Sequence, residues 1–213
     1  MLSSKEDLRY YLKCDKIALK IPDRIKRPRP FVDHIWKYEI LLRKTEYYTN
    51  RTHSKIGRII SLFYKTRLQL FGEKLGISIY VNCFGPGLSI AHHGCIVVNG
   101  NARIGNNCRI HEGVTIGTTN GSSKAPVIGN NCFLGSGCKV IGEITIADNI
   151  AIGAGAVVVK DIMQDNVSVA GVPAKIISSK GSDQNVVDAT NIVNKQETIL
   201  KKKRRSSFSY RAH

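Results

Sequence analysis

Aliphatic residues recur at every sixth position in the middle of the chain, and this period restricts the fold more than any other feature of the sequence. A glycine or alanine usually follows each of them, and a small or β-branched residue occupies the fifth position of most hexamers. A short fixed period punctuated by glycine predicts a β-solenoid built from hexapeptides. The repeating residues are Ile104, Ile110, Ile116, Ile128, Leu134, Val140, Ile146, Ile152 and Val158.

Each hexapeptide is expected to form one short strand and one tight corner, and three of them complete a triangular coil of about eighteen residues. The aliphatic side chains point inward, and the fifth residue must be small because it also points into the narrow interior. Cys108, Cys132 and Cys138 occupy this fifth position, so we interpret them as core residues. We extend this interpretation to Cys83 and Cys95.

The six-residue period is interrupted at two places. Ile90 and Ile110 are twenty residues apart, two more than one coil, and we expect a small bulge near the sequence VVNGNA at 97–102. Between Ile116 and Ile128 the segment GTTNGSSKAPV interrupts the strands, and its glycine, serine, threonine and asparagine content predicts a loop.

The segments on either side of the repeats have a different character. Residues 1–75 carry apolar residues at three- and four-residue spacing, which predicts helices ending at Gly72 or Gly76, and RIKRPRPF at 24–31 is expected to be an extended connector. Residues 76–177 form the predicted solenoid. Residues 178–213 lose all periodicity and are expected to form a basic tail without regular structure.

The positive charge of the chain is concentrated in these flanking segments. The net charge of +16 divides into +10 for residues 1–75, +1 for 76–177 and +5 for 178–213. The basic tail is interpreted either as solvated chain or as a contact for an anionic surface, and no motif for specific nucleic-acid binding accompanies it. Because neither an apolar signal segment nor a run of eighteen apolar residues is present, we expect a cytoplasmic protein.

Two adjacent histidines, His92 and His93, lie in the segment SIAHHGCIVVNGNARIG. Together with IHEGVTIG, VIGNNCFLGSGCKVIG, AIGAGAVVVKDI and AGVPAKII, this segment resembles the left-handed parallel β-helix acyltransferases. The resemblance covers residues 55–177. It is nearest to the serine acetyltransferase branch and the related sugar and polysaccharide O-acetyltransferases, so a mainly β fold with a helical N-terminal segment is expected.

The resemblance implies acetyl-CoA as the donor and homotrimers with active sites between neighbouring solenoids, with dimers of trimers through the helical segment as a further state. In this family the general base is the histidine four residues before the isoleucine of the IVV segment. Counting back from Ile96 identifies His92, and leaves His93 as the alternative base or an acceptor-binding group. An imidazole can take the proton of an alcohol as that alcohol attacks a thioester, so neither a covalent intermediate nor a metal is expected.

Coil counting adds a candidate partner for this base. If Ile90 stacks on Ile110, His92 lies over Glu112 and Ala91 lies over His111, because neighbouring strands stack about 4.8 Å apart. Glu112 is then a candidate for orienting the imidazole, and an exposed charge with no such role is the other interpretation. His93, His111 and Asn82 are the candidate acceptor-binding residues.

Coenzyme A is expected at glycine-rich corners and at lysines that could meet its phosphates, among them Lys160. Each glycine is equally well explained as a structural corner. The residues to which the resemblance points are Gly117, Thr118, Gly135, Ser136, Gly153, Ala154, Gly171 and Lys175.

The acceptor side departs from the serine acetyltransferase pattern. The aspartate that precedes the base in that branch is Ala91 here, the stretch one coil earlier contains Ser78 and Asn82 but no carboxylate, and the loop that carries the Arg-His or Asp-His element reads SSKAPV. These differences favour a sugar of a surface polysaccharide or its precursor as the acceptor, with L-serine as the alternative.

Two other classes of protein were weighed. A metalloenzyme of the carbonic-anhydrase type needs three convergent histidines, and only His111 and one of His92 and His93 lie in the solenoid segment. A non-enzymatic binding scaffold is supported only by the basic flanks.

Overall fold

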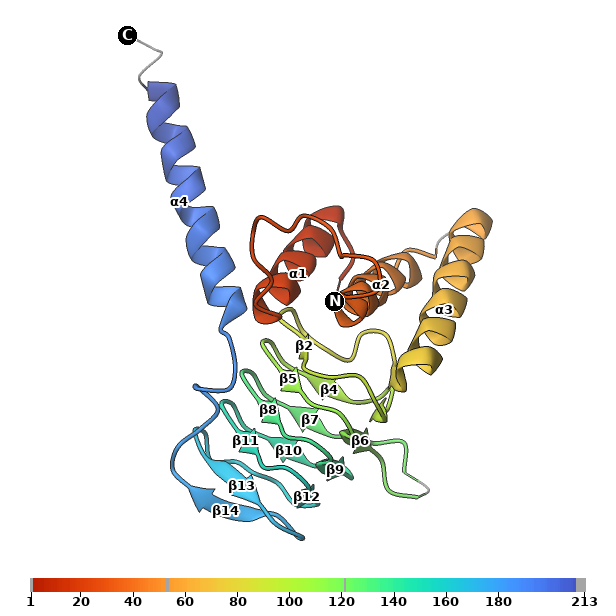
Figure 1. Ribbon diagram of the computed structural model, residues 1–213, viewed down its shortest axis with the longest axis vertical. Coiled ribbons are helices and arrows are strands. Elements are labelled where there is room, and N and C mark those ends of the chain that lie inside the picture. The colour runs from red at the N-terminus through yellow and green to blue at the C-terminus, as the bar shows by residue number, and fades with distance from the viewer. Residues whose placement is uncertain (1, 53, 121, 210–213) are drawn as a thin grey trace.

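The strands of the computed structural model, which describes residues 2–52, 54–120 and 122–209, form three sheets in which all pairs but one are parallel. Figure 1 shows them stacked as successive coils of a solenoid. The first sheet contains β1 (Ile77–Ile79), β3 (Ile96–Val98), β6 (Thr115–Gly117), β9 (Lys139–Ile141) and β12 (Val157–Val158). The second contains β4 (Arg103–Ile104), β7 (Val127–Ile128) and β10 (Thr145–Ile146). The third contains β2 (Ser89–Ile90), β5 (Arg109–Ile110), β8 (Phe133–Leu134), β11 (Ala151–Ile152), β13 (Ser168–Ala170) and the antiparallel β14 (Lys175–Ser178).

The six-residue period builds the core as predicted. Every repeating aliphatic residue from Ile104 to Val158 is buried, and so are Cys108, Cys132 and Cys138 at the fifth position. Burial raises the pKa of the Cys132 and Cys138 thiols to about 12, so both remain protonated core side chains. Cys83 is also buried, but the core assignment of Cys95 is wrong because this residue is exposed.

The two extra residues of the second coil do not lie near VVNGNA. Val98 pairs with Ile116, eighteen residues later, while Ile90 pairs with Ile110, twenty residues later. The additional residues therefore lie between Ile90 and Val98, in the corner that carries His92. Gly94 and Cys95 turn this enlarged corner with φ values of 123° and 49°.

Asparagines at the opposite corners form a ladder that joins one coil to the next. The Asn107 Nδ2 donates to the Asn131 Oδ1, and the Asn131 Nδ2 donates to the Asn149 Oδ1, both at 2.9 Å. All three residues have positive φ values, a conformation that asparagine tolerates better than most side chains. The IGNNC sequences at 104–108 and 128–132 therefore each supply an asparagine at a corner of the solenoid.

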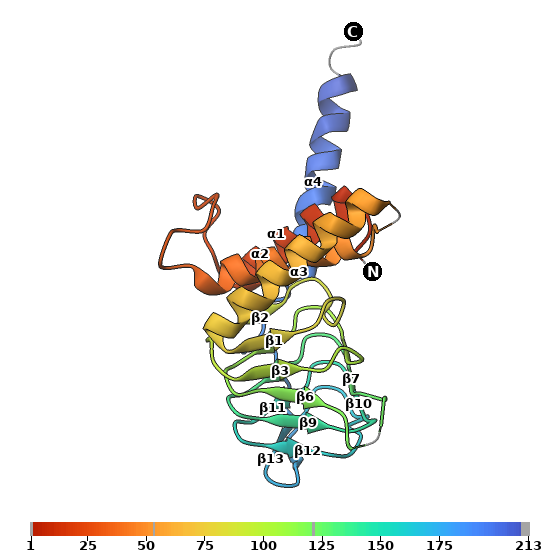
Figure 2. The same ribbon diagram turned by 90° about the vertical axis from the view of Figure 1, so that its right-hand side faces the viewer.

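Three helices cover the end of the solenoid where β1 and β2 lie, as Figures 1 and 2 show. They are α1 (Lys5–Ala18), α2 (His34–Thr49) and α3 (Lys55–Leu75). A capping box between Ser4 and Asp7 begins α1, and Gly76 ends α3 with a φ of 66°. The exposed face of α3 carries Ile59, Phe63 and other apolar residues.

A buried ionic cluster joins these helices to the first coil. Arg43 of α2 is fully buried and pairs with Asp15 of α1 at 2.7 Å and with Glu46 at 3.0 Å. It also donates to the carbonyl oxygens of Phe84 and Gly85. The first coil has no preceding coil to bond to, so these side chains satisfy its backbone groups.

The carboxylates complete this role by accepting from backbone N–H groups of the first coil. Asp15 accepts from Gly87 and Leu88. Glu46 accepts from Asn82. Glu39 accepts from the N–H of Ile90 at 2.9 Å, and burial raises the pKa of Glu39 well above its ordinary range. This last carboxyl therefore holds the strand that leads into the His92 corner.

The C-terminal segment is not without regular structure, contrary to the prediction. Residues Ala189–Ser209 form α4, which runs beside α1 and extends beyond the other helices (Figures 1 and 2). Ala189 and Val193 are buried against Cys14 and Ala18 of α1. A basic composition predicted a solvated tail, but a short apolar stripe is enough to dock the first turns of this helix. No helix in the described part of the chain is long and apolar enough to cross a membrane.

The raised pKa of Glu39 makes the stability of the protein dependent on pH. At pH values between the ordinary and the raised pKa of Glu39, the folded chain holds a proton that the unfolded chain has lost. The free energy of unfolding therefore falls as pH rises, by up to about 1.4 kcal/mol per pH unit. Glu39→Gln keeps an acceptor for the N–H of Ile90, and because glutamine does not ionise, it removes this loss of stability at higher pH. We expect its stability relative to the wild type, measured by urea unfolding, to improve from about pH 5 to about pH 7.

Glu39→Ala removes the acceptor as well and is expected to be less stable at both pH values. An equal difference between Glu39→Gln and the wild type at the two pH values would show that this carboxyl is ionised in the folded chain.

Candidate active site

Most of the predicted site residues lie on one column of corners, where the chain leaves the sheet that contains β2, β5 and β8. Backbone hydrogen bonds keep the column in register: the N–H of Ala91 donates to the Ile110 carbonyl at 2.9 Å, and that of His111 donates to Leu134 at 3.0 Å. In order along the column are His92, then His111 and Glu112, then Gly135 and Ser136, then Gly153 and Ala154, then Gly171.

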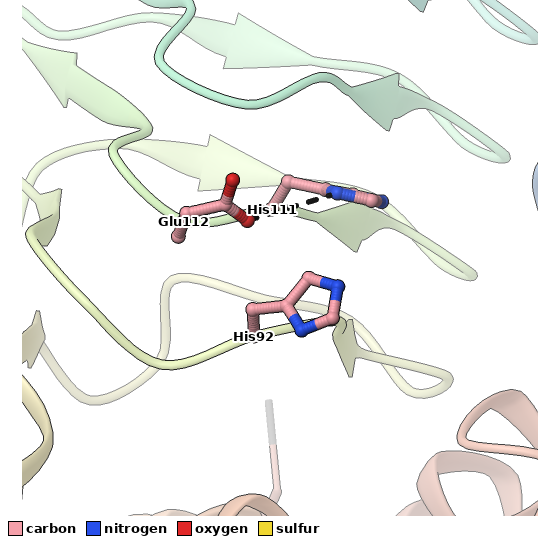
Figure 3. Close-up of side chains that lie close together, drawn as sticks. All are labelled: His92, His111 and Glu112. Carbon is pink, nitrogen blue, oxygen red and sulfur yellow. Dashed lines mark ion pairs between the residues drawn. The ribbon is translucent and has the colours of Figure 1, made fainter.

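The two histidines of this column stack edge to face. The ring centroids of His92 and His111 are 5.7 Å apart, and His111 packs in the same way on Phe133, at 5.1 Å. Figure 3 shows His92 and His111 projecting from successive coils, with Glu112 beside them. His92 is exposed, whereas His111 and Glu112 are half-buried. The exposed ring is thus the one that a substrate can reach.

Glu112 lies near both rings, but its closer interaction differs from the prediction. Its Oε2 is 3.9 Å from the Nδ1 of His111, and the structure gives no hydrogen bond between Glu112 and His92. The nearest side-chain ligand atoms of His92, His111 and Glu112 nevertheless all lie within 4.8 Å of one another. Glu112 is therefore a neighbour of His92 and an ion-pair partner of His111 when that ring is protonated.

The charges around these rings favour a neutral His111 and an ionised Glu112. Burial and the Arg109 guanidinium lower the pKa of His111. The hydroxyl of Ser136 and the local backbone lower the pKa of Glu112, although its Oε2 atom is inaccessible and has no hydrogen-bond partner in the described residues. Near neutral pH the cluster therefore contains an imidazole able to accept a proton and one negative charge.

Two of the predicted acceptor-binding residues are not part of this cluster. His93 is exposed in the enlarged corner, and the structure gives no contact between its ring and the cluster. Asn82 exchanges amide hydrogen bonds with Asn50 of α2, at 3.0 and 2.9 Å. Asn82 therefore joins the helices to the solenoid, and the structure does not bring it into the cluster of His92, His111 and Glu112.

The predicted donor-binding residues fall into two groups. Gly135, Ser136, Gly153, Ala154 and Gly171 share the column of His92. Beside them, Gly137 and Gly155 have positive φ values, and a Cβ added at either would meet nothing within 4 Å, so the surface here is open.

The remaining donor-binding residues lie elsewhere. Gly117 ends β6 in a different sheet, and Thr118 begins the loop that runs to β7. Lys175 begins β14 and is exposed. A cavity of about 670 Å³ lies between α3 and β1, and no predicted site residue lines it.

Arg109 is a candidate site residue that the sequence analysis did not name. It precedes His111 by two residues on the outer face of the same strand, and its Nη1 donates to the Ser89 Oγ at 2.8 Å. Among the described residues it has no carboxylate within ion-pair distance. The sequence did contain a signal for Arg109. It stands one residue before the inward-pointing Ile110, on the coil next to the coil of His92.

Comparison with known proteins places this geometry in a family. Residues 125–160 match the model for the bacterial transferase hexapeptide (six repeats). The chain is 32% identical over 141 residues to the serine acetyltransferase of Helicobacter pylori, covering 65% of this chain and 74% of that relative. A crystal structure of Brucella abortus serine acetyltransferase in complex with coenzyme A has 27% sequence identity and a TM-score of 0.62, covering 82% of this chain and 67% of that one.

The chain belongs to the hexapeptide-repeat transferase family. Its match to the Synechococcus elongatus serine acetyltransferase, 30% identical over 155 residues, covers 68% of this chain and 63% of that relative, so less than two thirds of that relative is represented. The family match agrees with the left-handed β-helix expected from the resemblance. These relatives are serine acetyltransferases, the alternative that the sequence analysis gave beside a polysaccharide acetyltransferase.

Proposed function

We propose that this chain is an acetyl-CoA-dependent O-acetyltransferase with His92 as its general base. The observation that carries the proposal is the placement of His92 at one end of a column of open glycine corners, in a chain whose relatives are serine acetyltransferases. The column puts a proton acceptor beside a surface on which the N–H groups of Ser136 and Ala154, which donate to no other described residue, can bind an extended ligand.

The reaction is a direct transfer. As the acceptor hydroxyl oxygen attacks the thioester carbonyl carbon, His92 takes the hydroxyl proton. A free backbone N–H at these corners, such as that of Ser136, stabilises the negative charge on the carbonyl oxygen. The carbon–sulfur bond then breaks, the coenzyme A thiolate leaves, and the imidazolium returns the proton to it. His111 packs against His92 and limits the positions of the catalytic ring.

We further propose that the donor lies along the corners of Gly135, Gly153 and Gly171, with Lys175 meeting its phosphates. Because Gly117 and Thr118 lie on another sheet, they would contribute from a neighbouring copy. This arrangement requires the homotrimer implied by the family resemblance. The exposed apolar residues of α3 would then be available for pairing of trimers through the helical segment.

The acceptor that we propose is L-serine. The carboxylates of the serine acetyltransferase pattern are missing here, but Arg109 supplies a cation on the strand face that also carries His111. Glu39, whose carboxyl acts on the charge of Arg109, has a raised pKa, so its protonated form leaves the guanidinium charge available. A hydroxyl compound with its own carboxylate, such as serine, can therefore be held at Arg109 while its hydroxyl meets His92.

Release of free thiol from acetyl-CoA tests the reaction class and the base. We expect turnover with L-serine and a decrease in kcat of about 100-fold or more in His92→Ala, because proton removal by the enzyme is lost. His93→Ala should lose less than about ten-fold. Equal losses in the two variants would contradict the assignment of the base, and turnover with a nucleotide sugar but not with L-serine would contradict the acceptor.

Substitution of Arg109 tests the carboxylate contact. Arg109→Ala is expected to raise the KM for L-serine about 10- to 100-fold, as loss of a charged hydrogen bond does, while the KM for acetyl-CoA stays nearly constant. Arg103 provides the matched control, since it stands one residue before the inward-pointing Ile104 on β4 and donates only to nearby carbonyl oxygens. A KM for L-serine that does not change in Arg109→Ala, or that changes equally in Arg103→Ala, would exclude this role.

A further inference from the structure

We propose that His92, His111 and Glu112 form a binding site for one Zn²⁺ ion. The general-base mechanism requires only one of these side chains to exchange a proton, yet the fold brings three good metal ligands together. Two imidazole nitrogens and one carboxylate oxygen are a donor set that zinc accepts in proteins, with a fourth position open to water or another ligand. The histidine count had argued against zinc, but the structure places a carboxylate where a third histidine was required.

The distances are close to those of a metal site. The candidate ligand atoms lie within 4.8 Å of one another. A tetrahedral zinc ion with bonds of about 2.0–2.2 Å holds its ligand atoms about 3.4 Å apart. Side-chain rotations that bring each pair together by at most about 1.4 Å are therefore sufficient. Figure 3 shows the three side chains on neighbouring corners of two coils, with the Glu112 carboxylate beside His111 and His92 on the next coil.

Glu112 supplies an independent observation. Its Oε2 atom is inaccessible to solvent and has no hydrogen-bond partner among the described residues. The Ser136 hydroxyl and the local backbone already favour the charged form of this carboxylate, so it is Oε2, 3.9 Å from the Nδ1 of His111, that is left without a partner of its own. A metal ion bound between Glu112 and the two rings would give this oxygen a partner.

The backbone that carries the ligands is fixed before any ion binds. The N–H of Gly113 donates to the Gly94 carbonyl at 2.9 Å, which joins the corner of Glu112 to the corner of His92. A Cβ added at Gly94 would lie 3.9 Å from the Cβ of Glu112, so the absence of a side chain leaves room beside the carboxylate. Arg109, a cation on the same coil as Glu112, donates to Ser89 on the preceding coil and forms no ion pair with Glu112.

Zinc binding would have a consequence for the proposed reaction. A ring nitrogen of His92 that is bonded to zinc has no lone pair with which to accept the acceptor's proton, so the ion would inhibit transfer. This consequence rests on the proposed function, whereas the metal site itself does not. Direct binding measurements therefore separate the two proposals.

Isothermal titration of ZnCl₂ into the metal-free full-length chain tests the site. We expect one ion per chain, and a Kd that rises at least about ten-fold in His111→Ala and in Glu112→Gln. His93→Ala, which removes the neighbouring exposed ring, and Cys95→Ser, which removes the nearby exposed thiol, should each leave the Kd within about two-fold of the wild type. The circular dichroism spectrum of each variant verifies that it is folded.

The outcomes distinguish all cases. No binding by the wild type, or binding that His111→Ala and Glu112→Gln leave unchanged, overturns the zinc site. Loss of binding in Cys95→Ser or His93→Ala instead would move the ion to other residues and overturns it as well. Zinc binding by a chain that shows no acetyl transfer supports the metal site and counts only against the proposed function. If the rate of acetyl transfer does not change when zinc is bound, His92 is excluded as a ligand.

Discussion

The open edge of the first coil is the constraint on which the rest of the structure depends. Every later coil shares backbone hydrogen bonds with the coil before it, but no coil precedes residues 82–90. The buried cluster of Arg43, Asp15, Glu46 and Glu39 supplies the missing partners, and it does so from two helices that are themselves joined by the cluster. Such buried charges are tolerated because almost all of their atoms are paired.

This junction also connects the helices to the candidate site. Glu39 binds the N–H of Ile90, and two residues later the chain reaches His92. The corner of His92 is larger than its neighbours, and the N–H of Gly113 joins it to the corner of Glu112. The backbone enters this corner from the strand that Glu39 holds. It leaves the corner into β3, which is fixed by its pairing with β6.

Periodicity predicted the solenoid, its core and its loop because one side chain in six must meet the same steric demand in every coil. The position of the extra residues could not be predicted in this way. The spacing from Ile90 to Ile110 reveals how many residues are added but not which corner contains them. A positive φ is often indicated by a glycine in the sequence, but a cysteine such as Cys95 gives no such indication. Arg109 was not named, and the contact of Asn82 with Asn50 was not foreseen, for a related reason, since these contacts depend on partners in other coils or helices. Basic composition likewise concealed the few apolar residues that dock α4.

The enlarged corner between Ile90 and Val98 shows how a solenoid can change its chemistry. The coil after it returns to the six-residue spacing, so the two added residues disturb neither the stacked interior nor the glycine corners further along. A corner of this kind can be lengthened, shortened or given other side chains while the remaining coils keep their form. One copy of the repeat thus provides a place where the choice of small molecule can diverge independently of the surface that binds the common donor.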